Sequence, residues 1–133
     1  SGPPAVLRRY NNMPRIKAFG WVDDMKRHYR KAQLFIAPLQ IGGGTRLKLL
    51  DAAAHGLPIV STTKGAEGIG LRGGADFWKA DTPFAFTRSV ARALDVPSER
   101  MRRARNARCY VVRQHDLRQI TERAADVFRK LLN

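Results

Sequence analysis

The residues with the clearest chemical potential form a glycine-rich segment between an apolar run and an expected helix. Glycine leaves the backbone free to bend and lets a ligand approach without a Cβ in the way. The first turn of a helix offers unpaired N–H groups and the positive end of a dipole, which suit a phosphate group. The candidate phosphate-binding residues are Gly42, Gly43, Gly44, Thr45, Arg46 and Lys48. Asp51 follows them by less than two helical turns, so its carboxylate could reach a bound polar group.

These residues do not match either of two common phosphate-binding signatures. A Walker A loop needs Gly-x-x-x-x-Gly-Lys followed by Ser or Thr, whereas Lys48 is followed by Leu49. The spacing does not fit Gly-x-Gly-x-x-Gly either. Two interpretations remain open: an anion pocket, or a turn that only allows a strand and a helix to pack tightly. For Arg46 and Lys48, the alternative to pairing with a phosphate is a surface charge in solvent.

The surrounding pattern predicts an α/β fold. Apolar runs at residues 34–37 and 57–61 are short and indicate buried strands, and weaker strand patterns occur at 15–19 and 76–80. Helices are expected over residues 5–10, 23–32, 45–55, 82–95, 98–113 and 116–132. Alternating strands and helices are typical of a parallel sheet with covering helices. We therefore expect about four strands, covering helices and a helical C-terminus, with the glycines at the ligand-binding edge of the sheet.

Composition excludes several classes of protein. The 133 residues are 44% hydrophobic and 27% charged, which suffices for one packed core and argues against disorder. No apolar run approaches the ~20 residues of a membrane span, and residues 1–4 do not begin a signal peptide. A single cysteine, Cys109, excludes an internal disulfide framework, and the three histidines lack metal-ligand spacing. We expect a cytoplasmic chain with no metal site.

The charge balance is the outlier. Lys and Arg number 25 against 11 Asp and Glu, which gives a net charge of +14. Residues 99–113 hold six arginines and only one acid, Glu99. Such a helix could bind nucleic acid or an anionic membrane, or could simply be solvated. Nucleic-acid binders usually interleave exposed aromatic residues, whereas Tyr110 is the only aromatic here and has apolar neighbours, so nucleic acid is disfavoured.

The segment Gly42–Thr62 resembles the donor-binding domain of GT-B glycosyltransferases, retaining enzymes that use nucleotide sugars. Four flanking segments match in the same order: Gly20–Asp24, Ala32–Leu39, Gly65–Gly68 and Ala80–Pro83. The resemblance covers nearly the whole chain. It implies a partial Rossmann-like sheet, with residues 1–133 forming part of the C-terminal donor-binding domain and truncated on its N-terminal side.

The resemblance also implies roles for individual residues. The backbone from Gly43 to Arg46 would lie against the donor diphosphate, and Asp51 stands where many members have a glutamate that contacts the ribose. A second family glutamate, which contacts the donor sugar, falls at Gly43 and is therefore missing. Trp21 and Val22 would lie near the nucleobase, although plain packing is an alternative for Trp21.

Partners follow from the same resemblance. A nucleotide sugar would be the donor substrate, with no cofactor. The acceptor-binding domain and the basic residues that neutralise the leaving diphosphate are absent from this chain, so the isolated chain should lack transfer activity. The missing strands would leave an exposed sheet edge, which favours self-association. The arginine helix could dock an enzyme for lipid-linked acceptors on the cytoplasmic face of a membrane.

Overall fold

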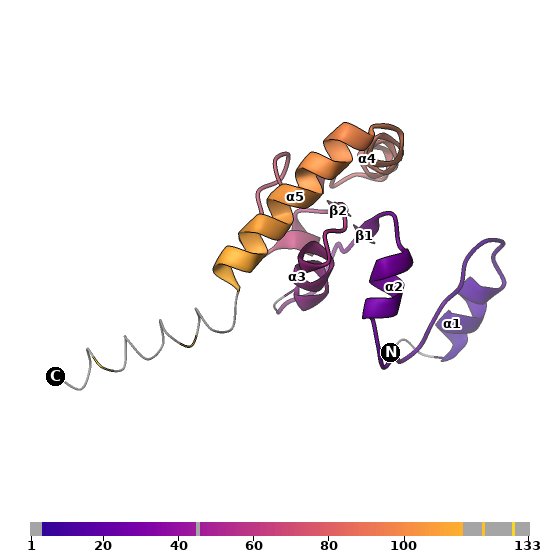
Figure 1. Ribbon diagram of the computed structural model, residues 1–133. Helices are drawn as coiled ribbons and strands as arrows, with labels where there is room; N and C mark the ends of the chain where they lie inside the picture. The colour runs from indigo at the N-terminus through magenta and orange to yellow at the C-terminus, as the bar shows by residue number, and fades with distance from the viewer. Residues whose placement is uncertain (1–3, 45, 116–120, 122–128, 130–133) are drawn as a thin grey trace.

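The computed structural model describes residues 4–44, 46–115, 121 and 129 (Figure 1). Thr45 lies outside the described residues, as does the helix expected over 116–132 apart from Thr121 and Arg129. The described part is an α/β unit in which helices cover a small parallel sheet. This confirms the predicted fold class.

The sheet has three short strands in the order β1-β2-β3, and both pairings are parallel. They are β1 (Phe35–Ala37), β2 (Ile59–Ser61) and β3 (Trp78–Lys79). The central strand β2 is buried along its whole length, which agrees with its continuous apolar sequence. The expectation that β1 is buried like β2 is wrong: β1 is an edge strand whose outer side pairs with no described strand, and Ile36 stays 51% exposed.

Helices precede, connect and follow the strands along the chain. They are α1 (Pro4–Asn11), α2 (Lys26–Lys31), α3 (Leu47–Ala54), α4 (Pro83–Asp95), α5 (Pro97–Gln114) and the short 3-10 helix η1 (Lys64–Ala66). The start of α4 is well specified, because the Thr82 hydroxyl accepts the Ala85 N–H at 3.2 Å and Pro83 occupies the first turn. Among the described helices, none is both long and apolar enough to cross a membrane.

The two faces of the sheet have separate cores. Ile59 points into the larger core, which α3 and α5 cover, while the next residue, Val60, points to the face covered by α4. The long helix α5 lies across α3, and α1 lies at the far end of the molecule beyond α2 (Figure 1). This layering leaves the two loops that follow β1 and β2 at one edge of the sheet.

The strand expected at residues 15–19 is wrong. The Asn11 side chain accepts the Ala18 N–H at 2.6 Å and donates to the Ala18 carbonyl at 3.2 Å, so it satisfies both groups that a neighbouring strand would bind. Arg15 has a φ of 64°, and Phe19 stays 57% exposed. An alternating pattern forms a strand only beside a partner, and no described strand lies there. The described sheet therefore has three strands rather than about four.

Candidate functional site

The candidate site lies at the carboxyl edge of the sheet, where two loops meet. The glycine-rich loop runs from the end of β1 to the start of α3, and a second loop runs from β2 through η1. The Thr62 hydroxyl donates to the carbonyl of Leu39, and the Ser61 hydroxyl donates to the carbonyl of Ala37 at 3.3 Å. These bonds hold the start of one loop against the end of the neighbouring strand.

The three glycines of the loop differ in why a side chain is absent there. Gly42 and Gly44 have φ values of 129° and 81°, which side-chain-bearing residues rarely adopt. A Cβ added at Gly43 or Gly44 would meet no atom within 4 Å. The loop is therefore open to solvent at the two glycines that precede Thr45, and a ligand can approach their backbone directly.

Arg46 holds this loop in place. Its guanidinium donates to the carbonyls of Gly42 at 2.7 Å and Gly43 at 3.0 Å, and to the carbonyl of Lys64 in the second loop at 3.4 Å. Its Nε is buried and has no hydrogen-bond partner among the described residues. Arg46 is thus neither a freely solvated charge nor paired with an acid. Its partners are neutral, so its positive charge is not cancelled.

Charged side chains of both signs lie near the loop, but they differ in whether they are paired. Lys64 Nζ lies 2.6 Å from Glu67 Oε2, and this hydrogen bond, followed by the charges of Lys64 and Arg46, lowers the pKa of Glu67. Lys48 adds a further exposed cation on the first turn of α3. Lys64 is thus paired with Glu67, whereas Arg46 and Lys48 make no ion pair within the described residues and stay available to attract an anion.

A bond between Asp81 and Thr63 fixes the second loop, and sequence reasoning missed both residues. The Asp81 carboxylate accepts the Thr63 N–H at 2.6 Å and its hydroxyl at 2.7 Å, and these bonds lower the pKa of Asp81. The Gln40 amide donates to the Asp81 carbonyl at 3.5 Å. The segments following all three strands are thereby tied together. The available signal was an acid directly after a strand, at the edge where loop N–H groups gather.

A hollow of about 420 Å³ opens between β1 and α3 beside this loop. Its walls are mostly apolar, and Arg46 and Lys48 supply its charges. The structure therefore brings these two predicted residues together. The lining residues are Phe35, Ile36, Ala37, Pro38, Leu39, Arg46, Leu47, Lys48 and Leu49.

Asp51 lies on the side of α3 that faces α2. Its side chain is exposed, and burial of Tyr29 together with the charge of Asp51 raises the pKa of Tyr29. The Tyr29 hydroxyl donates to the carbonyl of Lys48 at 3.4 Å, and its ring lies 5.1 Å from that of His55. Asp51 does not line the β1–α3 hollow.

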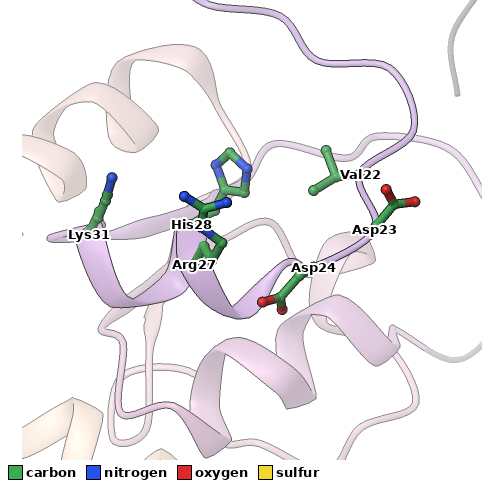
Figure 2. Close-up of a pocket in the computed structure, with 6 residues that line it drawn as sticks. All are labelled: Val22, Asp23, Asp24, Arg27, His28 and Lys31. Atoms are coloured by element: carbon green, nitrogen blue, oxygen red, sulfur yellow. The ribbon is translucent and has the colours of Figure 1, made fainter.

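Trp21 and Val22 lie apart from the glycine-rich loop. Trp21 is 84% exposed and its Nε1 donates to Asp23 at 3.0 Å, so Trp21 does not pack into the core of the described part of the chain. Val22 lines a second hollow of about 390 Å³ with charged residues of α2 and the loop before it (Figure 2). This hollow shares no residue with the β1–α3 hollow. Within the described ranges, no three His, Cys, Asp or Glu side chains are placed to share a metal ion.

Comparison with known proteins identifies the family. The family model described as "Glycosyl transferases group 1" matches residues 1–96. The chain belongs to this family. Glycosyltransferase membership, which the sequence resemblance implied, is thus confirmed at the family level.

A solved structure supports the fold. Sucrose-phosphate synthase from Thermosynechococcus elongatus matches with a TM-score of 0.79 and 18% sequence identity. The match covers 96% of this chain and 33% of that chain, so this glycosyltransferase chain spans about a third of the length of its structural relative. A comparison with curated proteins found no match. At this identity the structural likeness shows the fold alone.

Proposed function

We propose that this chain is part of the C-terminal, donor-binding domain of a retaining GT-B glycosyltransferase. The observation that carries the proposal is the open, positively charged glycine-rich loop at the carboxyl edge of a parallel sheet. In open α/β sheets this edge is where ligands bind. The donor is a nucleotide sugar, bound as a substrate, and no cofactor is proposed.

The donor diphosphate would lie against residues 43–46. Gly43 and Gly44 leave their backbone accessible, and the first turn of α3 follows directly. Arg46 binds the carbonyls of the loop without making an ion pair to any described residue, and Lys48 adds an exposed cation. Sugar transfer releases a nucleoside diphosphate, so groups preorganised around that charge also favour the reaction.

Asp51 would bind the ribose, and Trp21 and Val22 would approach the nucleobase. Support comes from their common neighbour α2: Asp51 influences Tyr29 of this helix, and Val22 shares its hollow with Arg27 and other α2 residues. A nucleoside extending from the glycine-rich loop over α3 toward α2 would meet both groups. A carboxylate can accept hydrogen bonds from two ribose hydroxyls.

The rest of the enzyme would lie outside this chain. The acceptor would be held by a domain that precedes this one, so we propose that the isolated chain binds donor without transferring sugar, in the cytoplasm. The outer side of β1 pairs with no described strand, and Ile36 of this strand is 51% exposed. This edge would accept a strand from the rest of the protein or from a second copy.

Calorimetric titration with UDP, GDP, ADP and their sugar conjugates tests the proposal. We expect one of these nucleotides to bind to the native chain. Arg46→Gln should abolish binding, because the glycine-rich loop loses both its clamp and its charge. The matched control is Arg9→Gln on α1, which removes the same charge from an exposed position. A folded chain that binds none of these nucleotides, or that loses binding equally in both variants, would contradict the proposal.

A further inference from the structure

One face of α5 is an exposed row of arginines. Because the helix repeats every 3.6 residues, side chains that recur along one side of it between positions 101 and 113 point away from the core. We call this row the arginine ridge: Met101, Arg102, Arg105, Arg108, Val112 and Arg113, all exposed. The opposite side of α5 carries the buried residues Ala104, Ala107 and Val111. The helix is therefore anchored on the protein through one side and presents its charge on the other.

The ridge arginines differ from the other arginines in and around α5. Arg103 lies over the Trp78 ring at 4.7 Å and donates to the Phe77 carbonyl at 3.3 Å. Arg92 pairs with Glu99, the only acid in α5. No ridge arginine makes a hydrogen bond or an ion pair with the described part of the chain. The arginines of the ridge thus have guanidinium groups available for an external anion.

A shallow groove runs along one flank of the ridge. It has a volume of about 350 Å³ and lies between α5 and the turn from α3 to β2. Gly56 in this turn has a φ of 74° and lies directly beneath the stem of Arg108. Arg100, Arg105 and Arg108 line the groove with Met101, and no acid lines it. A phosphate headgroup in this groove would meet three arginines and the apolar side chain of Met101.

We propose that the arginine ridge docks the protein onto an anionic phospholipid bilayer. Arginines supply attraction to anionic headgroups, while Met101 and Val112, exposed by 63% and 51%, can enter the interface between them. Single-stranded nucleic acid fits less well, because its binding sites combine basic residues with exposed aromatic rings on which the bases stack. The only aromatic residue of α5, Tyr110, is half-buried, with its hydroxyl against Gly70.

The orientation leaves the candidate donor site free. The glycine-rich loop precedes the first residue of α3, whereas the groove lies at Gly56 and Pro58, just after its last residue. The two sites are therefore at opposite ends of the same helix. A bilayer against the ridge would contact the side of the molecule formed by α5 while the glycine-rich loop stays accessible. The inference itself does not depend on the proposed donor binding.

Vesicle co-sedimentation tests this proposal with the full chain. We expect binding to vesicles of phosphatidylcholine mixed with phosphatidylglycerol and none to phosphatidylcholine alone. The triple variant Arg105→Gln, Arg108→Gln, Arg113→Gln should bind about a hundred-fold more weakly, since each arginine near an anionic surface contributes about a factor of five. The matched control removes the same charge elsewhere, by Arg8→Gln, Arg9→Gln and Arg30→Gln, and should bind within about two-fold of the native chain.

A second variant separates a bilayer from other polyanions. Met101→Ser with Val112→Ser leaves the charge unchanged and should weaken vesicle binding several-fold without affecting binding to single-stranded RNA. Circular dichroism melting of every variant shows that it is folded. Equal weakening in the two triple variants would overturn the proposal, as would a native chain that binds RNA but not anionic vesicles.

Discussion

Replacing Gly65 with alanine should destabilise the protein strongly, because η1 is packed tightly against the strand ends. An added Cβ would lie 2.5 Å from Ser61 Oγ and 2.7 Å from the Ala37 carbonyl oxygen. The Ser61 hydroxyl can rotate away only by giving up its bonds to the carbonyls of Ala37 and Thr62. The Ala37 carbonyl belongs to β1 and cannot move without shifting that strand. Overpacking costs about 2 kcal/mol and one lost buried hydrogen bond costs about 1 kcal/mol, so the free energy of unfolding should fall by about 3 kcal/mol.

Thermal and urea unfolding followed by circular dichroism measure this effect. A loss of about 3 kcal/mol in the free energy of unfolding corresponds to a melting temperature lowered by about 10 °C in a chain of this size. The matched control is Gly43→Ala, because its Cβ would meet no atom within 4 Å and its φ is not positive. This control should change the free energy of unfolding by less than about 1 kcal/mol. Equal melting temperatures for the two variants would refute the described packing of η1.

Three further predictions concern side chains. Hydrogen bonds from Thr63 lower the pKa of Asp81, so its carboxylate stabilises the fold above its ordinary pKa and loses that effect as the pH falls. The stability difference between the native chain and Asp81→Asn in urea should therefore be constant near neutrality and shrink below about pH 4; a difference that grows there would contradict it. Arg46→Lys keeps the charge but loses the guanidinium fork, so hydrogen exchange of residues 42–44 should accelerate; unchanged exchange would show that the fork does not order the loop. Arg103→Ala should lower the free energy of unfolding in urea by about 2 kcal/mol, whereas Arg102→Ala at an exposed position should leave it almost unchanged. Equal losses would refute the stabilising contacts of Arg103.

The sequence predicts the elements whose signals are local. The short apolar runs of β1 and β2 correctly predict strands, although only β2 is buried along its whole length. The residues that start α4, Thr82 and Pro83, carry their own capping chemistry. The strand at 15–19 failed because strand formation depends on a partner strand, which no local pattern supplies. The Asn11 side chain takes the partner's place instead.

The site is predictable in outline for a similar reason. Glycines before a helix predict an open loop, and Gly43 and Gly44 form such a loop. The clamp by Arg46 and the bond between Asp81 and Thr63 were not predicted, because both join loops distant in sequence. Such contacts depend on the order of the strands, which brings the loop ends together only after the sheet has formed.

Amide-resolved NMR titration with UDP, GDP and ADP, each free and as its sugar conjugates, tests the central claim most directly. We predict that one nucleotide shifts the amide signals of residues 42–51. Asp51→Ala should remove those shifts that arise from contact with the ribose. The arginine ridge should remain unshifted in the same titration. A well-dispersed spectrum in which no nucleotide shifts residues 42–51, or in which the shifts gather on α5, would contradict the claim that this loop binds the sugar donor.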